Sequence, residues 1–255
     1  MNFLHALILS GVEGITEFLP VSSTGHLVLT ASLLSISQTD FVKSFEIVIQ
    51  LGAILAVVFL YRNTLIRSPK IWKPLFAAFL PTSVIGFLLY ATIKRSLLGN
   101  TAVTVAALGF GGVILVALEL WGKGMEKKGT IDRLSWNRAV YIGLAQALSV
   151  VPGVSRAAAT IVGGLAVGLS RSEAVVFSFL LAIPTMIAAS ALDMAKSSFL
   201  FTPREWWLLT TGFIGAFLTA LITVRIFTQF VKNHSLVVFG VYRIVVALLF
   251  WFVYR

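Results

Sequence analysis

The sequence predicts an all-α integral membrane protein, a polytopic helical bundle, and three observations support this class. Of the 255 residues, 58% are hydrophobic and only 12% are charged, whereas about 25% of the residues of a typical soluble domain are charged. The mean hydropathy is +0.96. Apolar runs of roughly 20 residues, the length with which a helix crosses a bilayer, recur along almost the whole chain. We therefore expect a single membrane domain over residues 1–255.

The charged residues and the lack of cysteine exclude several classes of function. A chain without cysteine has no disulfides and no thiolate metal sites. The net charge of +10 would suggest nucleic acid for a soluble protein, but the basic residues lie mostly in short loops, the usual orientation signal of a membrane protein. We therefore expect membrane lipids and no nucleic acid as partners. The first apolar run begins at Phe3 without a basic segment before it, so no cleavable signal peptide is expected.

The first element is predicted to be a helix over residues 2–19 that ends at a proline. Glu13 and Glu17 lie one turn apart on the same face of this helix. Pro20 then breaks it, and a second short helix is expected to run to about Ser35. Each arm is short or interrupted by polar residues, so we expect a re-entrant hairpin that is buried in protein or lines a wet cavity. Three hydroxyl residues can cap the second arm: Ser22, Ser23 and Thr24.

Six clearer apolar spans and a second broken stretch account for the rest of the chain. The broken stretch covers residues 139–169 and is interrupted at Pro152 and Gly153, so we expect a second re-entrant hairpin there. The six spans are expected at 42–61, 74–93, 102–122, 173–195, 206–227 and 236–254.

The two broken stretches occupy matching positions in an internal repeat. At an offset of 133 residues, Ser22 falls on Ser155. Each repeat, about 1–125 and about 135–255, is expected to hold one re-entrant helix hairpin plus three transmembrane spans. Because an odd number of crossings inverts the second half, the sequence predicts two inverted-topology repeats. Broken helices at matching positions in such repeats indicate a binding site at the repeat interface.

The charges of the loops orient this arrangement in the membrane. Loops 62–73 and 123–138 carry four and five Lys or Arg residues, whereas loops 94–101 and 196–205 carry two each. Since the richer loops are expected to face the cytoplasm, the first hairpin enters from outside and the second from inside. Both chain termini then face outward, and the tips of the hairpins can meet near the middle of the membrane.

The residues after each break are suited to binding an anion. Ser22 and Ser23 stand at a helix start, where unpaired backbone N–H groups and the helix dipole both favour negative charge. Ser155 and Arg156 repeat the layout and add a guanidinium, the side chain best shaped for bidentate phosphate contact. Thr160 lies one turn further on the same face and adds another donor. These residues are the candidates for binding a phosphate ester.

Two glutamates beside a phosphate would repel it, and a divalent cation resolves this conflict. Mg²⁺ or Ca²⁺ binds carboxylate and phosphate oxygens together, so Glu13 and Glu17 are the candidate metal ligands. His26 lies about one turn after Ser23 and can serve as general base, as nucleophile, or as acid to the leaving phosphate. Ser23 is the other candidate nucleophile, and the sequence leaves the choice between them open.

Other polar residues have weaker assignments. Glu46 and Gln50 share a face of the first full span and are expected to close the pocket. For Arg156, a structural ion pair with one of the two glutamates is the alternative to phosphate binding. Arg243 is expected to extend its guanidinium to the membrane interface.

The two dense motifs resemble the signatures of a known bacterial family. Glu13-Gly-Ile-Thr-Glu-Phe-Leu-Pro-Val-Ser-Ser-Thr-Gly-His26 is similar to the glutamate-rich signature of the undecaprenyl pyrophosphate phosphatases, the BacA/UppP bacitracin-resistance family. Pro152-Gly-Val-Ser-Arg-Ala-Ala-Ala-Thr160 resembles the second signature of that family. The resemblance implies a multi-pass hydrolase of the bacterial plasma (inner) membrane. It would remove the terminal phosphate of the C55 lipid diphosphate and so recycle the carrier for cell-wall synthesis, with its active site open to the outer (periplasmic) side.

The resemblance also implies roles for matching residues. Glu17 takes metal and acid/base roles together with its neighbour Glu13, and a divalent cation serves as cofactor. His26 and Ser23 fall on the reactive pair and Arg156 falls on the phosphate clamp, with Ser155 and Thr160 as its supports. One departure is that Ala157 and Ala158 replace the usual Ser-Gly, which removes one hydroxyl and makes the turn less permissive.

Two other functions fit parts of the pattern. A polyprenyl-phosphate transporter or flippase could use the same inverted fold, but a carrier needs the anion clamp and no nucleophile. An ion-coupled exporter could use Glu13 and Glu17 as proton carriers, but Arg156 would hold a carboxylate ionised. We therefore expect hydrolysis of a polyprenyl diphosphate lipid, with a homodimer left open.

Overall fold

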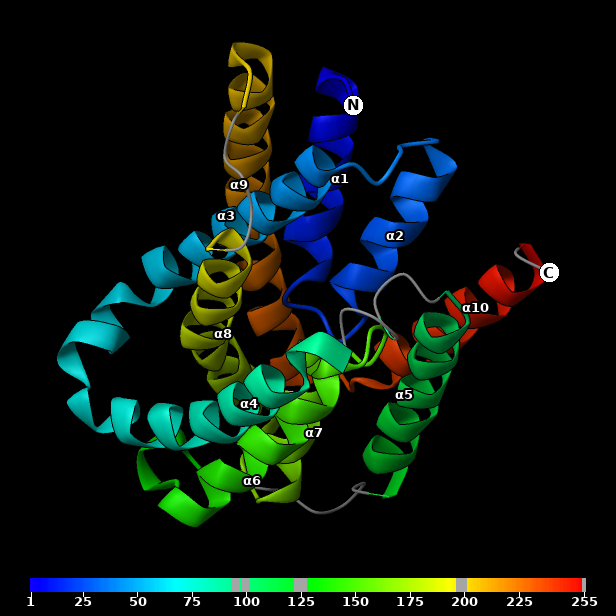
Figure 1. Ribbon diagram of the computed structural model, residues 1–255. Helices are drawn as coiled ribbons and strands as arrows, with labels where there is room; N and C mark the ends of the chain where they lie inside the picture. The colour runs from blue at the N-terminus through cyan, green and yellow to red at the C-terminus, as the bar shows by residue number, and fades with distance from the viewer. Residues whose placement is uncertain (93–96, 98–100, 122–127, 196–200, 254–255) are drawn as a thin grey trace.

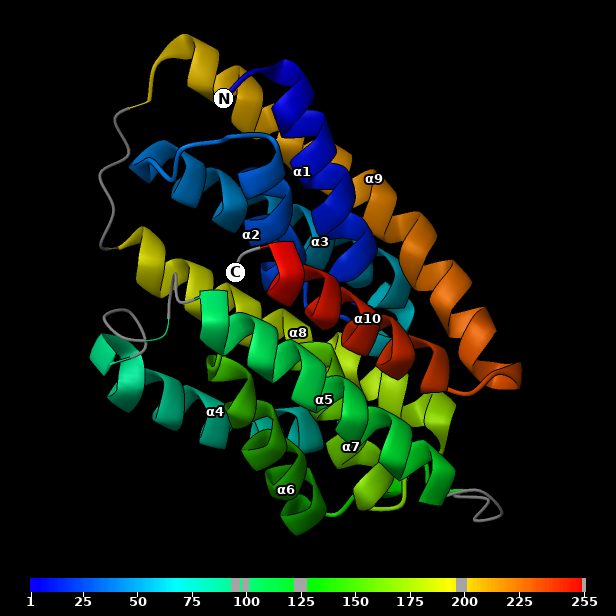
Figure 2. The same ribbon diagram turned by 90° about the vertical axis from the view of Figure 1, so that its right-hand side faces the viewer.

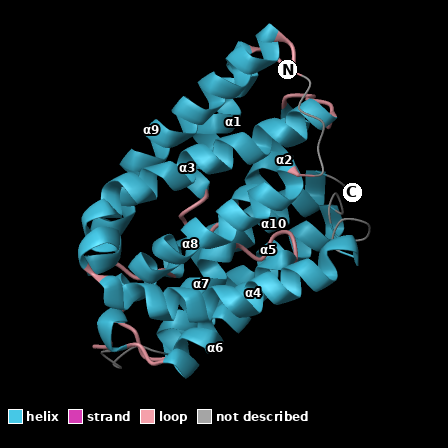
Figure 3. Cartoon of the chain, turned by 60° about the vertical axis from the view of Figure 1, so that its left-hand side comes forward, coloured by secondary structure: helices cyan, strands magenta, loops and turns pink. Residues whose placement is uncertain are grey.

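The computed structural model describes residues 1–92, 97, 101–121, 128–195 and 201–253, and within these ranges the chain is all-helical (Figure 3). Apart from helices and loops, the described residues form only one isolated parallel bridge, between Gly129 and Leu169. The prediction of an all-α protein is confirmed.

Five of the helices are long and apolar enough to cross a membrane, which confirms a multi-pass membrane protein. The sixth predicted span, 236–254, corresponds to α10 (Val237–Val253), which has 17 residues and falls short of the roughly 20 that a span needs. The five long helices are α3 (Asp40–Arg67), α4 (Trp72–Thr92), α5 (Thr101–Trp121), α8 (Arg171–Met194) and α9 (Pro203–Asn233).

The two broken stretches each fold into a pair of short helices. The first pair is α1 (Phe3–Thr16) and α2 (Ser23–Leu33), and the second is α6 (Trp136–Ala147) and α7 (Arg156–Ala166). Both chain breaks therefore lie at the predicted prolines. Short 3-10 turns complete the described helical elements: Pro69–Ile71, Ile131–Arg133 and Leu148–Val150.

The helices pack in three groups that meet at the chain breaks. Helices α1, α3 and α9 pack against one another, α5 packs along α10, and α4, α6, α7 and α8 form the third group (Figures 1 and 2). Phe18, in the first break, is fully buried and meets Phe179 of α8 edge-to-face, with ring centroids 5.4 Å apart. The first break is thus packed directly onto the third group.

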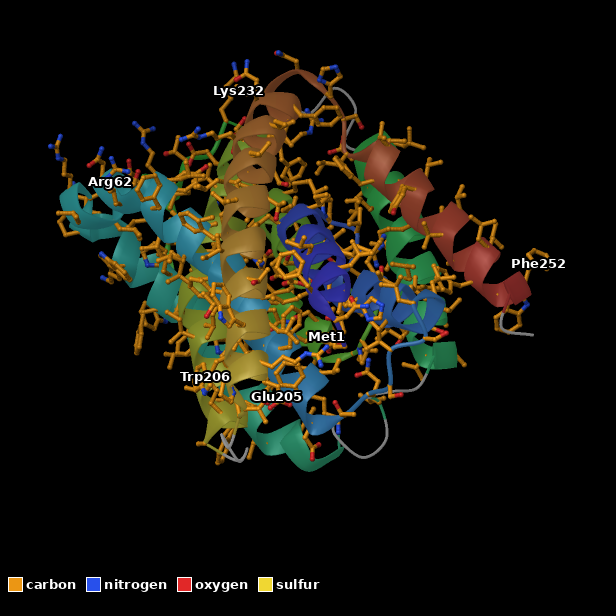
Figure 4. The ribbon with its side chains drawn as sticks, turned by 90° about the horizontal axis from the view of Figure 1, so that it is seen from above. Met1, Arg62, Glu205, Trp206, Lys232 and Phe252 are labelled. Carbon is orange, nitrogen blue, oxygen red and sulfur yellow. The ribbon has the colours of Figure 1, made fainter. Side chains whose placement is uncertain are left out.

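The outer surface is apolar, as a lipid-facing surface requires. Phe252 lies at the rim of the molecule (Figure 4) with 75% of its surface exposed, and Trp121 and Phe87 are 87% and 69% exposed. The membrane orientation stays a prediction, because several of the counted basic residues lie outside the described residues: Lys94, Arg95, Lys123, Lys127 and Lys196.

Candidate active site

The two chain breaks meet through an ion pair between Glu17 and Arg156. Glu17 follows the last residue of α1, and Arg156 is the first residue of α7, 139 positions later. Arg156 Nη2 lies 2.8 Å from Glu17 Oε1, with only 9% and 4% of the two side chains exposed. Residues from the two separate motifs are therefore in direct contact, and the ion-pair alternative for Arg156 is the arrangement observed.

The second oxygen of the same carboxylate holds a hydroxyl. Ser23 Oγ donates a hydrogen bond of 2.6 Å to Glu17 Oε2, and both groups are buried. Hydrogen bonds to a charged acceptor are short and strong. A carboxylate in this position can take the proton of the hydroxyl, which would make Ser23 a nucleophile. Glu17 thus connects Ser23 of one motif to Arg156 of the other.

Helix α8 and the end of α1 fix the guanidinium of Arg156. Its Nη1 donates to the carbonyl oxygen of Ser178 at 2.8 Å, and its Cζ lies 5.8 Å from the ring centroid of Phe18. Thr160 is fully buried, and its hydroxyl lies 2.9 Å from the Arg156 carbonyl oxygen and contacts Ser178 Oγ. Thr160 therefore supports the backbone behind Arg156 and does not face open space. The buried Nε of Arg156 has no hydrogen-bond partner.

Ser22 and Ser155 are equivalent N-caps with the same unusual backbone. Their φ angles are +73° and +74°, in the left-handed region that is strained for a residue with a side chain. Ser22 Oγ accepts from the N–H of Gly25, and Ser155 Oγ accepts from the N–H of Ala158. Such strain costs of order 1–3 kcal/mol at each position and concentrates at functional sites. Its recurrence at an offset of 133 residues supports one function for both helix starts.

His26 is held away from Ser23. Its Nδ1 lies 2.8 Å from the carbonyl oxygen of Ser22, and its Nε2 lies 2.7 Å from the hydroxyl of Tyr242 in α10. Ser23 bonds to Glu17 instead. The two candidate nucleophiles thus have different partners, and the carboxylate serves Ser23.

Glu13 offers free carboxylate oxygens next to this network. Its side chain is fully buried, and neither oxygen has a hydrogen-bond partner. Glu17, Glu46 and Arg156 lie close enough to act on it electrostatically. The described residues contain no cluster of three or more His, Cys, Asp or Glu residues that could enclose a metal ion. A pair of carboxylates still fits Mg²⁺, which usually takes one or two carboxylates and completes its shell with substrate phosphate and water.

Gln50 is the one predicted site residue that the structure leaves apart from the network. It is half-buried in α3 and makes no hydrogen bond to any described residue. Its predicted role in closing the pocket stays a prediction.

The expectation for Arg243 is wrong, because this side chain is fully buried. Its guanidinium donates to the carbonyl oxygen of Pro20 at 3.2 Å and to that of Gly153 at 2.9 Å, so it joins the two chain breaks. It also donates to the carbonyl oxygens of Leu108 and Ala107 in α5. A side chain at Gly111 would occupy the space of this guanidinium, so α10 can pack closely on α5 with Arg243 inside.

Sequence reasoning also missed two further partners of the site. Tyr242 contacts His26, and Ser178 accepts from Arg156. A signal for α10 was present, since Tyr242 and Arg243 interrupt an otherwise apolar helix. Ser178 had no comparable signal, because it is an isolated serine in an apolar span.

The comparisons with known proteins agree over almost the full length. A family model described as bacitracin resistance protein BacA matches residues 6–249. The chain is 54% identical over 250 residues to a protein of Aquifex aeolicus named undecaprenyl-diphosphatase, with 98% of each chain covered. Proteins of the same name from Persephonella marina and Campylobacter fetus are 46% and 45% identical, again with 98% of each chain covered.

Proposed function

The chain belongs to the bacitracin resistance protein BacA family, and we propose that it is an undecaprenyl-diphosphatase of the bacterial plasma membrane. It hydrolyses undecaprenyl diphosphate to undecaprenyl phosphate and inorganic phosphate, as the names of its full-length relatives state for them. The observation that carries this proposal is the Glu17 carboxylate, which binds the Ser23 hydroxyl and the Arg156 guanidinium at the same time.

Arg156 is the group that binds the terminal phosphate. A guanidinium in a site shielded from water attracts a diphosphate strongly, because it donates two parallel hydrogen bonds in addition to its charge. The helix starts capped by Ser22 and Ser155 add positive helix-dipole ends. When the phosphate takes over part of the Arg156 contact, Glu17 keeps its bond to Ser23 and is freed to act as a base.

Ser23 is the nucleophile in the first step. Its Oγ attacks the terminal phosphorus, Glu17 takes the hydroxyl proton, and the bond from that phosphorus to the bridging oxygen breaks, so that undecaprenyl phosphate leaves. In the second step, water attacks the phosphoserine and releases inorganic phosphate. His26 is the base for this water, since Nδ1 faces a carbonyl oxygen and must carry the proton, which leaves a lone pair on Nε2. Attack by His26 itself is the alternative, and it lacks a neighbouring carboxylate.

A divalent cation, Mg²⁺ or Ca²⁺, is the proposed cofactor. The unpartnered oxygens of Glu13 and the adjacent carboxylate of Glu17 would hold it. The ion would supply positive charge that offsets the repulsion between the two glutamates and the substrate.

The chain breaks fit a proposed inverted-repeat architecture. On this proposal, α1–α2 and α6–α7 are re-entrant hairpins of two repeats, about 1–125 and about 135–255, inserted from opposite sides of the membrane. The matching N-caps and φ angles of Ser22 and Ser155 support it. The positive-inside assignment opens the active site to the outer side. A polyprenyl-phosphate carrier of the same fold would need the Arg156 clamp but not the contact between Ser23 and Glu17.

Phosphate release from farnesyl diphosphate in detergent tests this function. Wild-type protein should release phosphate and lose this activity with EDTA, whereas Ser23→Ala and Arg156→Ala should be nearly inactive although folded. Arg225→Ala is the matched control, because Arg225 is exposed on α9 and forms no ion pair with any described residue. Retained turnover in Arg156→Ala, or wild-type protein that binds the lipid without releasing phosphate, would contradict the hydrolase.

A further inference from the structure

Two elements that are far apart in the sequence hold the imidazole of His26. From its own helix, the carbonyl oxygen of Ser22 lies 2.8 Å from Nδ1. From α10, the hydroxyl of Tyr242 lies 2.7 Å from Nε2, 216 positions away in the sequence. The two rings are nearly parallel, at 8°, with centroids 5.6 Å apart. Both ring nitrogens therefore have a specific partner.

These two contacts select one tautomer of His26. A carbonyl oxygen only accepts hydrogen bonds, so Nδ1 must be the nitrogen that carries the proton. In the neutral ring, Nε2 then holds a lone pair, and the hydroxyl of Tyr242 is the donor that meets it. The nitrogen that a histidine uses is set by the hydrogen bond that the other nitrogen makes. The arrangement therefore fixes the direction of the ring and keeps Nε2 basic.

The position of the tyrosine hydroxyl is itself determined by the chain breaks. Its neighbour Arg243 is fully buried and binds the carbonyl oxygens of Pro20 and Gly153. Because α10 is held to both breaks, Tyr242 stands at a fixed place beside α2. Arg243 is also the charged group that acts on His26 from α10, and α2 itself carries no acidic or basic residue besides His26.

We propose that Tyr242 is a positioning residue for the reaction, acting through His26 by holding the imidazole with its basic Nε2 ready to accept a proton. The inference rests on the proposed function, because it assigns His26 a role in the phosphatase reaction. Tyr242 itself takes no part in bond making or breaking. Its effect on the rate should therefore exist only while His26 is present.

A double-mutant cycle of Tyr242→Phe and His26→Gln tests this dependence with farnesyl diphosphate as substrate. Tyr242→Phe keeps the ring and loses the hydroxyl, and we expect kcat to fall about tenfold, which corresponds to about 1.4 kcal/mol, with KM changed less than about twofold. In the His26→Gln background, the same change should have no further effect on the residual rate. Tyr61→Phe is the matched control, since it loses a hydroxyl contact to Thr228 elsewhere in the molecule, and its kinetics should match wild type.

The outcomes separate the inference from the function on which it rests. Wild-type protein without phosphatase activity would overturn the proposed function. Active wild-type protein combined with an unchanged or faster Tyr242→Phe variant would overturn only the inference. An equal loss in the presence and absence of His26 would also overturn it, because Tyr242 would then act on the lipid or on the fold.

The ring nitrogens give a second measurement that does not depend on turnover. In protein labelled with ¹⁵N-histidine, the signals of His26 are identified by their absence in His26→Gln, which leaves His5 and His234. Wild-type protein should show His26 as the Nδ1–H tautomer. Tyr242→Phe should shift the Nε2 signal, and Tyr61→Phe should not. A wild-type ring protonated only at Nε2, or no change in Tyr242→Phe, would overturn the inference.

Discussion

The two broken stretches share a backbone and differ in chemistry. Ser22 and Ser155 cap α2 and α7 in the same way and have φ angles within 1° of each other. The first stretch supplies the acids, the hydroxyl and the imidazole, whereas the second supplies the guanidinium of Arg156. A duplicated scaffold can thus bring opposite charges to one point, with each half specialised for one side of the reaction.

The difference is clearest at one pair of matching positions. At the offset of 133 residues, Glu13 corresponds to Gln146, and both side chains are fully buried. The amide of Gln146 donates to Thr82 and Thr185, two hydroxyls of neighbouring helices. The carboxylate oxygens of Glu13 have no such partners. A buried polar group without a partner is costly, so Glu13 is the member of this pair that calls for a ligand.

The largest effect is expected where the two stretches touch. Glu17→Gln removes the proton acceptor of Ser23 and the charge opposite Arg156, so kcat should fall about 10³-fold. Phosphate release by purified protein measures it. Asp40→Asn is the control, because Asp40 is a fully exposed carboxylate that pairs with Lys43. A Glu17→Gln variant with wild-type turnover would separate the contact between the stretches from the chemistry.

The next effect concerns the residue that joins both stretches from outside. Arg243→Met leaves the carbonyl oxygens of Pro20, Gly153, Ala107 and Leu108 without this donor, and an unsatisfied buried group costs about 1–3 kcal/mol. We expect the free energy of unfolding to fall by at least about 3 kcal/mol. Arg243→Lys, which keeps a charge and three donors, should lie between wild type and Arg243→Met. Denaturation in detergent followed by circular dichroism measures this, and equal stability of all three proteins would contradict the role of Arg243.

A smaller effect separates the matched pair of buried side chains. Glu13→Gln should weaken the activation by Mg²⁺ at least about tenfold, the typical cost of losing even an indirect partner of a metal site. Gln146→Leu should leave the Mg²⁺ dependence unchanged and lower stability, because Thr82 and Thr185 lose a partner. Titration of activity with Mg²⁺ after EDTA treatment measures both. The same Mg²⁺ requirement in Glu13→Gln and wild type would exclude Glu13 as a ligand.

The smallest effect tests the shared scaffold itself. Ser22→Ala and Ser155→Ala each lose an N-cap hydrogen bond and should lower the free energy of unfolding by about 1 kcal/mol. Ser155→Gly should cost less than Ser155→Ala, because glycine adopts a positive φ without strain. Thermal unfolding of the single variants compares the two positions. A clearly larger loss at one of them would mean that the two helix starts are not equivalent.

The sequence predicted the elements of the site but not all of their partners. Pro20 and the Pro152-Gly153 pair marked both breaks, and Ser22 was expected as a cap, because these are local backbone effects that neighbouring residues decide. Arg243 was misplaced for the opposite reason. An arginine in an apolar helix near the chain end usually reaches for water, and only the packing of α10 on α5 shows that four carbonyl oxygens replace that water.

The sequence by itself determined the membrane class, the helix boundaries to within a few residues for most elements, and the residue types of the site. These depend on hydropathy, capping and proline, which act over one or two turns of chain. The tertiary structure alone decided that Glu17 pairs with Arg156, that Ser23 bonds to Glu17 while His26 bonds to Tyr242, and that Thr160 is buried behind the clamp. The contacts of Glu17 with Arg156 and of His26 with Tyr242 join residues 139 and 216 positions apart, and the packing of separate helices determines which side chains meet over such separations.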